Sequence, residues 1–244
     1  MKEKIESGIE GIDKMLYGGI PVRSQIMLAG GPGTGKTLFA FEFLYKGAKI
    51  GEPGVFFSFE EESSSIINNA KKAFPSFTDI DKLIDEKKLV VQGLGETKPY
   101  IQKDTEGSQY TFGRMITEIE SIAESAQATR LVLDSVSLMR LFIREPFEYR
   151  SVSMDLVAVL RRLGITSIIT TEIETPEKSR LLFQPEFFIY DGLIIMYTSG
   201  SMGELSTLTL EVVKMRGSNH SRATVPYEIS PNGIELTLIH ENKP

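Results

Sequence analysis

The chain has 244 residues, of which 41% are hydrophobic and 25% charged, as in an ordinary globular domain. A net charge of −6 argues against a general attraction to nucleic acid or anionic membranes, and the lack of cysteine excludes disulfides and zinc–thiolate sites. No apolar run reaches the length that crosses a bilayer, and the first residues lack the apolar core of a secretory signal, so we expect a cytoplasmic protein without a membrane partner.

The first strong motif spans residues 30–37 and reads GGPGTGKT, which matches the phosphate-binding pattern G-x-x-x-x-G-K-[ST] at every position. Its glycines let the backbone wrap closely around phosphate groups and turn several N–H groups toward them. Lys36 can reach the β and γ oxygens, and the Thr37 hydroxyl can ligate Mg²⁺. The residues predicted to bind the nucleotide here are Gly31, Pro32, Gly33, Thr34, Gly35, Lys36, Thr37 and Leu38.

The flanks of this loop have the order that the motif requires. Residues 25–29 form an apolar run typical of a buried strand, and residues 38–50 predict a helix that ends before Gly51. The amino end of that helix would point its partial positive charge at the phosphates. A nucleoside triphosphate site therefore fits this segment better than an ordinary glycine-rich turn.

Further apolar runs alternate with amphipathic helical segments along the chain, which predicts an α/β fold with a mostly parallel twisted sheet flanked by helices. The predicted strands are 54–59, 89–94, 130–133, 166–170 and 192–197, and the predicted helices include 63–74, 112–123 and 152–163, the last ended by Gly164. Residues 94–111 read as a surface loop and residues 199–203 as a hairpin turn. The β-rich segments 208–215, 223–229 and 234–239, separated by turns, predict a C-terminal antiparallel extension. Because no linker divides the chain, we predict one domain over residues 1–244.

Polar residues at strand ends are the next candidates, because open parallel sheets bind ligands outside the carboxyl ends of their strands. Asp134 follows the run 130–133, and we predict it as the second anchor for Mg²⁺, held directly or through water. The alternative is that Asp134 and Ser135 only begin a turn.

Three glutamates follow the strand predicted at 54–59. Glu60 and Glu61 are predicted to orient and polarise water for attack on the γ-phosphate. They could instead form the solvated first turn of the following helix, and we expect Glu62 to have only that structural role.

The motifs GGPGTGKT, FSFEEE, LVLDS, IITTE and KMRGSNH together resemble the RecA superfamily of P-loop ATPases, and within it the RadA/KaiC branch. The resemblance covers nearly the whole chain. KMRGSNH, residues 214–220, points to the KaiC-like group rather than to recombinases. The resemblance implies a RecA-like fold and a ring, usually a hexamer, with ATP bound between neighbouring subunits.

The resemblance also implies roles for residues far from the phosphate-binding loop. Lys214 and Arg216 would reach the γ-phosphate of the neighbouring subunit's ATP, with Ser218 and His220 beside them. Thr171 and Glu172 correspond to the family's sensor position. From the residues alone, segment 214–220 could equally be an exposed turn with scattered basic residues.

We therefore expect a ring-forming, Mg²⁺-dependent ATPase that acts as a nucleotide-dependent switch on an unidentified protein partner. Its predicted catalytic residues are Glu60, Glu61, Lys36, Lys214 and Arg216. A DNA-binding recombinase paralogue is the main alternative, because the predicted loops 139–150 and 173–186 mix basic and aromatic residues, although their acidic residues cancel the charge.

An autokinase or an ATP-assembled scaffold with little turnover is a further alternative. The positions that carry phosphorylated Ser and Thr in clock-type KaiC are Phe187 and Phe188 here, which argues against autophosphorylation at that place. Nearby hydroxyl acceptors are Tyr190, Ser151 and Ser153.

Overall fold

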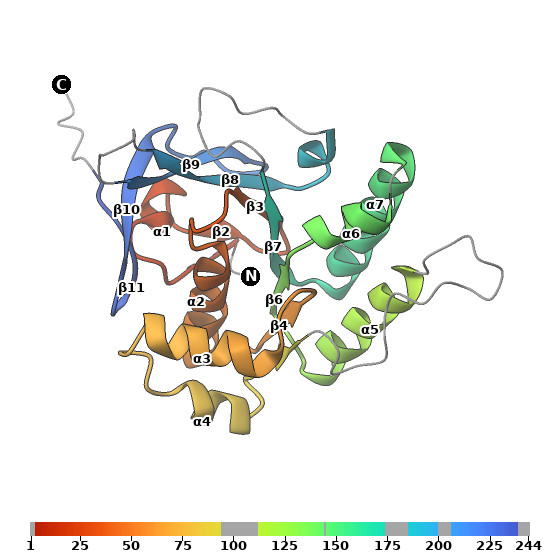
Figure 1. The fold of residues 1–244 in the computed structure, drawn as a ribbon, viewed down its shortest axis with the longest axis horizontal. Helices are drawn as coiled ribbons and strands as arrows, with labels where there is room; N and C mark the ends of the chain where they lie inside the picture. The colour runs from red at the N-terminus through yellow and green to blue at the C-terminus, as the bar shows by residue number, and fades with distance from the viewer. Residues whose placement is uncertain (1–2, 94–111, 144, 174–184, 200–205, 239–244) are drawn as a thin grey trace.

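The computed structural model describes residues 3–93, 112–143, 145–173, 185–199 and 206–238. Across these residues the main sheet has nine strands in the order β11-β10-β9-β8-β3-β7-β6-β4-β5 (Figure 1). Its parallel strands are β3 (Gln25–Gly30), β4 (Gly54–Ser58), β5 (Leu89–Gln92), β6 (Arg130–Asp134), β7 (Thr166–Glu172) and β8 (Gly192–Ser199). The fold is thus α/β with a mostly parallel sheet, as the sequence predicts.

The predicted C-terminal antiparallel extension is confirmed. It consists of β9 (Thr207–Met215), β10 (Thr224–Ser230) and β11 (Gly233–Leu236), which continue the sheet beyond β8. A separate two-stranded sheet joins β1 (Lys4–Ile5) to β2 (Ile20–Pro21), with the short helix α1 (Ile12–Met15) between them in sequence.

Helices cover both faces of the main sheet (Figure 1). One face is covered by α2 (Lys36–Lys49), α3 (Ser63–Ala73) and α4 (Ile80–Asp85), and the other by α5 (Phe112–Ser125), α6 (Ser137–Phe142) and α7 (Pro146–Leu163). The period of two along each strand explains the two resulting cores. In β3, Ile26 and Leu28 face the α2 side, whereas Met27 and Ala29 face the α7 side.

Glycines follow the carboxyl ends of the helices α2 and α7. α2 ends at Lys49 and is followed by Gly51 with φ 83°, and α7 ends at Leu163 before Gly164 with φ 71°. Both glycines take the left-handed conformation that terminates a helix, as predicted.

In the described part of the chain, no helix combines the length and the apolar character that crossing a membrane requires.

The prediction of a continuous loop over residues 139–150 is wrong. Residues up to Phe142 belong to α6, and α7 begins at Pro146. Proline is favoured in the first helical turn because its fixed φ suits the helix and its missing N–H leaves no unpaired donor there. Met139, Ile143 and Tyr149 are buried in the core on this face, so packing favours helices over a free loop. Of the second predicted loop, 173–186, residues 174–184 lie outside the described residues. The whole of the predicted surface loop 94–111 and residues 200–203 of the predicted hairpin turn also lie outside them.

Candidate nucleotide site

The phosphate-binding loop connects the carboxyl end of β3 to the amino end of α2, as its motif requires. A Cβ atom at Gly30 would lie 2.7 Å from Thr34 Oγ1 and 2.9 Å from the Met196 carbonyl oxygen, so the loop leaves no room for a side chain at that position. Gly35, immediately before α2, has φ 84°, which favours glycine. Pro32 and Gly33 are exposed at the outside of the loop, and Leu38 turns back toward the core.

The buried Lys36 side chain folds over this loop. Its Nζ donates a 3.0 Å hydrogen bond to the Gly31 carbonyl, which also accepts a 2.8 Å hydrogen bond from Thr34 Oγ1. Burial lowers the pKa of Lys36, while the charges of three nearby carboxylates act in the opposite direction. These carboxylates belong to Glu172, Asp134 and Glu60. Three of the predicted catalytic and metal residues therefore share one electrostatic environment.

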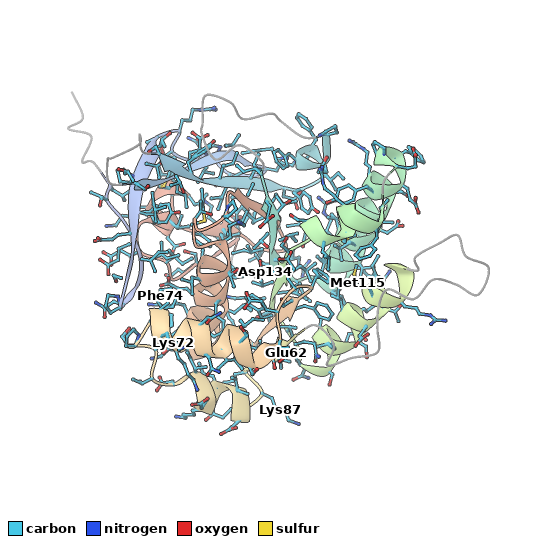
Figure 2. The ribbon with its side chains drawn as sticks, in the orientation of Figure 1. Glu62, Lys72, Phe74, Lys87, Met115 and Asp134 are labelled. Atoms are coloured by element: carbon cyan, nitrogen blue, oxygen red, sulfur yellow. The ribbon has the colours of Figure 1, made fainter. Side chains whose placement is uncertain are left out.

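Asp134 lies at the end of β6, next to the start of α2. Thr37 Oγ1 donates a 2.8 Å hydrogen bond to its Oδ2, and Thr170 Oγ1 donates to its Oδ1. Burial raises the pKa of Asp134, although these two hydrogen bonds act in the opposite direction. Figure 2 shows Asp134 near the middle of the molecule, between the helices of the two faces.

The residues present fit a bound Mg²⁺ ion. A hydroxyl and a carboxylate in contact offer the hard oxygen ligands that Mg²⁺ prefers, and the remaining positions suit water and phosphate oxygens. No thiolate or imidazole that would favour a softer metal contacts Thr37 or Asp134 in the described hydrogen bonds.

The structure distinguishes Glu60 from Glu61 by their contacts, although the charge of Glu61 also raises the pKa of Asp134. Burial raises the pKa of Glu60, and so do the charges of Asp134 and Glu172, while a hydrogen bond with Ser135 lowers it. Glu61 instead accepts a 2.8 Å hydrogen bond from Ser65 Oγ. Glu60 therefore belongs to the carboxylate group around Lys36.

Glu61 is further tied to the helix that follows it, because Asn69 Nδ2 also donates to its carboxylate, at 3.3 Å. Glu62 is the residue before α3, at the end of that helix seen in Figure 2, and makes no side-chain cap hydrogen bond. The position of Glu62 outside the carboxylate group agrees with a structural role.

Thr171 and Glu172, the predicted sensor residues, lie at the end of β7, which is longer than predicted because it pairs with β3 up to Gly30. Ser137, at the start of α6, accepts a 2.7 Å hydrogen bond from the Glu172 N–H and lies 3.2 Å from Thr171 Oγ1. Sequence reasoning did not single out Ser137, and it noted Thr170 only as a polar residue at a strand end. Their only sequence signal is a hydroxyl within a few residues of a predicted site residue.

Lys214 and Arg216 do not join this group. β9 is antiparallel to β8, and Met215 pairs with Gly192 at the amino end of β8, whereas the phosphate-binding loop lies at the carboxyl ends of the parallel strands. Lys214 Nζ donates to the Phe187 and Tyr190 carbonyls at 2.9 and 2.6 Å. These two cations therefore lie at the amino ends of the parallel strands, whereas Lys36 of the same chain lies at their carboxyl ends.

The residues after them are held locally. Arg216 Nη2 donates to the Phe188 carbonyl at 2.9 Å, within the short 3₁₀ helix η2 (Pro185–Phe188). The Ser218 hydroxyl donates to the Asn219 carbonyl, and the backbone N–H of the half-buried His220 donates a 2.9 Å hydrogen bond to Asn219 Oδ1. In one chain, Ser218 and His220 remain with Arg216 and apart from the phosphate-binding loop.

The described part of the predicted nucleic-acid surface forms a cavity of about 510 Å³ between α6, α7 and η2. Arg140 pairs with the buried Glu186 and stacks over the Tyr149 ring at 4.8 Å. Arg150 donates to the Pro185 carbonyl at 3.2 Å, and Phe147 is 86% exposed. The positive charge in this cavity is therefore partly neutralised.

Comparison with known proteins gives consistent results. The family model described as the KaiC ATPase matches residues 5–241. A UPF0273 protein of Thermotoga maritima is 34% identical and covers 97% of this chain and 96% of its own length. The circadian clock oscillator protein KaiC of Synechococcus elongatus is 34% identical over 96% of this chain, which spans 44% of that protein. The crystal structure of a KaiC-like protein from Pyrococcus horikoshii has a TM-score of 0.80 and 31% identity, covering 96% of this chain and 99% of the other.

Proposed function

The chain belongs to the KaiC ATPase family, and we propose that it is a single-domain, Mg²⁺-dependent ATPase that forms a ring with ATP between neighbouring subunits. The family match supports a nucleotide-binding ATPase in general. Hydrolysis, the metal, the ring and a switch function are the parts that we propose, together with a cytoplasmic location.

One observation carries the proposal of hydrolysis. Lys36, Asp134 and Glu60 come from three separate segments of the chain and share one electrostatic environment beside the phosphate-binding loop. Lys36 would hold the β and γ oxygens, Asp134 with Thr37 would hold Mg²⁺, and Glu60 would orient the attacking water. Glu60 has the raised pKa that suits a general base better than an ordinary surface glutamate does.

The geometry of the two basic residues supports a site shared between subunits. Lys214 and Arg216 lie at the amino ends of the parallel strands, and the phosphate-binding loop lies at the carboxyl ends, so the two cations are unsuited to complete their own chain's site. In a ring, that edge would face the neighbour, and the two cations would stabilise charge that develops on its γ-phosphate. Occupancy and hydrolysis would then alter the interface, which is how a ring acts as a switch toward a protein partner.

The test is ATP turnover with and without Mg²⁺ in the parent, Lys36→Ala and Lys49→Ala. Lys49 is the matched control, because it lies in the last turn of the same helix and pairs with Asp79 on the surface. We expect Lys36→Ala to lose at least about a hundredfold in turnover and Lys49→Ala to remain near the parent. Equal turnover in the parent and Lys36→Ala would contradict the proposal.

A scaffold that assembles on ATP without turnover is distinguished by oligomeric mass. We expect Glu60→Gln to form the ring with ATP and to keep it, because binding survives while hydrolysis stops. A parent that assembles equally and shows no Mg²⁺-dependent turnover would favour the scaffold.

For the autokinase alternative, Tyr190 and Ser153 are buried, and Ser151 is the exposed acceptor among the three predicted.

DNA binding is the second candidate function. The cavity where Arg140, Arg150 and the exposed Phe147 meet favours it, because such side chains pair with phosphates and stack on bases. The pairing of Arg140 with Glu186 argues against it, so we rank it below the ATPase switch. Single-stranded DNA that at low salt neither binds nor stimulates ATP turnover would exclude it.

A further inference from the structure

The C-terminal hairpin of β10 and β11 lies against the phosphate-binding loop and its helix, at the side of α2 seen in Figure 1. Tyr227, in β10, is 5% exposed, and its hydroxyl donates a 2.6 Å hydrogen bond to the carbonyl of Thr34. Thr34 is a residue of the loop itself and is fully buried. This contact joins positions 193 residues apart in the sequence, and no motif of the loop requires it.

We propose that Tyr227 is a positioning residue of the nucleotide site, whose hydroxyl fixes the Thr34 carbonyl and thereby keeps the Gly35 N–H turned toward bound phosphate. This inference rests on the proposed use of the loop as an ATP site. It assigns to the C-terminal hairpin a part in nucleotide affinity that is separate from the cations Lys214 and Arg216.

The planarity of the peptide bond couples the direction of the Thr34 carbonyl to that of the Gly35 N–H. In a trans peptide the carbonyl oxygen of one residue and the N–H of the next point in opposite directions. When Tyr227 holds the Thr34 carbonyl on the hairpin side, the Gly35 N–H points away from the hairpin. In loops of this kind the backbone N–H groups are the ligands of the phosphates, so the direction of one peptide matters for binding.

A second contact restricts the same peptide. A Cβ atom at Gly35 would lie 2.7 Å from Ile229 Cδ1, two residues beyond Tyr227 in β10. The hairpin therefore lies close to Gly35, where a side chain would have to displace the end of Ile229, and φ 84° at Gly35 independently favours glycine. Tyr227 and Ile229 together hold both residues of the peptide from one side.

The tip of the hairpin is anchored separately, which keeps Tyr227 in place. Glu42, in the second turn of α2, is buried and accepts a 2.7 Å hydrogen bond from the Ile234 N–H. Ser76 Oγ donates to the Pro231 carbonyl at 2.8 Å. Burial also raises the pKa of the Tyr227 hydroxyl, so that the hydroxyl remains a hydrogen-bond donor over the whole physiological range.

The test measures nucleotide affinity directly, by equilibrium binding of a fluorescent ADP and by the KM and kcat for ATP, in Tyr227→Phe and Tyr197→Phe. Tyr197 is the matched control, because it is also buried and its hydroxyl donates a 2.6 Å hydrogen bond to Glu211 rather than to a residue of the loop. Both variants lose one hydroxyl and keep the aromatic ring of the side chain.

We expect Tyr227→Phe to raise the Kd for ADP and the KM for ATP about threefold to tenfold, which is the scale of one hydrogen bond. We expect kcat at saturating ATP to stay within about twofold, because bound phosphate itself then orients the peptide. Tyr197→Phe should lower the melting temperature without changing Kd.

Two results would overturn the inference. One is an unchanged Kd in Tyr227→Phe while its melting temperature falls, which would make the hydroxyl a purely structural contact. The other is an equal rise in Kd in both variants. A parent protein that binds no nucleotide would contradict the proposed function itself, and the two failures are thus distinguished.

Discussion

The hydroxyl of Thr37 donates a 2.8 Å hydrogen bond to the carboxylate of Asp134, although 97 residues separate them in the sequence. The contact joins the first turn of α2 to the end of β6. It brings together the two side chains that the sequence predicts as Mg²⁺ ligands, and does so with their oxygens in contact.

Thr37→Ala should lower Mg²⁺-dependent ATP turnover by about thirtyfold or more, because it removes one metal ligand and one partner of Asp134. Thr37→Ser keeps the hydroxyl and should stay within about threefold of the parent. The measurement is turnover as a function of Mg²⁺ concentration. A Thr37→Ala protein with the Mg²⁺ dependence of the parent would show that this hydroxyl is not a ligand.

Glu60 and Glu61 should differ sharply in their effect on turnover. Glu60→Gln should lower kcat about a hundredfold or more with nucleotide binding retained, because the amide cannot accept a proton from water. Glu61→Gln should stay within about tenfold, because Ser65 and Asn69 hold the Glu61 carboxylate, and its link to the site is only the effect of its charge on Asp134. A larger loss of kcat in Glu61→Gln than in Glu60→Gln would reverse this assignment.

Glu42 should make the free energy of unfolding depend on pH. Burial raises the pKa of Glu42 from 4.5 to about 7, with the Glu235 charge acting in the same direction and Lys46 and the Ile234 N–H acting against it. Since the folded pKa is above the unfolded one, the stability that the protonated group contributes is full below about pH 4.5 and is lost as the pH rises through about 7.

Relative to Glu42→Gln, the parent should therefore lose about 2 to 3 kcal/mol between these two pH values. Urea unfolding of both proteins across the range measures this difference. Glu228→Gln, an exposed change in the same hairpin, serves as the control and should follow the parent. A constant difference between the parent and Glu42→Gln would contradict the raised pKa.

Arg130 should be a large contributor to stability. Its fully buried guanidinium donates to the Glu52 carboxylate at 2.6 and 2.9 Å and to the Phe43 and Glu6 carbonyls, both at 2.7 Å. Arg130→Met leaves these acceptors without their donor and should lower the free energy of unfolding by about 3 to 5 kcal/mol.

The control for Arg130 is Arg161→Met, which breaks a half-exposed pair with Asp191 and should cost less than about 1 kcal/mol. Urea denaturation measures both changes. Equal losses in the two variants would show that the buried network adds nothing beyond a surface ion pair.

Much of the fold was predictable because its signals are local. The apolar runs and the alternation of strands with amphipathic helices fixed the parallel sheet, and Gly164 marked the end of α7. The prediction of a loop over 139–150 is wrong because it rests on the resemblance to RecA-like proteins, in which a loop follows the corresponding strand, whereas here Met139, Ile143 and Tyr149 pack into the core. Buried packing of that kind depends on neighbours from the rest of the chain.

The site was predictable only in part, for a similar reason. The motif identified Lys36 and Thr37, but two adjacent glutamates look alike in a sequence, and only their contacts in the fold, such as that of Glu61 with Ser65, distinguish them. Tyr227 gave no signal at all, because its partner is a backbone carbonyl and not a side chain with a recognisable pattern. The contacts of Lys214 with two carbonyls of its own chain were equally invisible.

The central claim is that each ATP is held by one subunit's Lys36 and completed by the neighbour's Arg216. Its most direct test is ATP turnover by mixed rings of Lys36→Ala and Arg216→Ala, co-expressed with different tags and purified through both. Each variant alone should be inactive. In mixed rings about a quarter of the interfaces would pair an intact loop with an intact Arg216, so turnover should recover to about that fraction of the parent rate. Mixed rings that are no more active than the two variants apart would contradict the shared site.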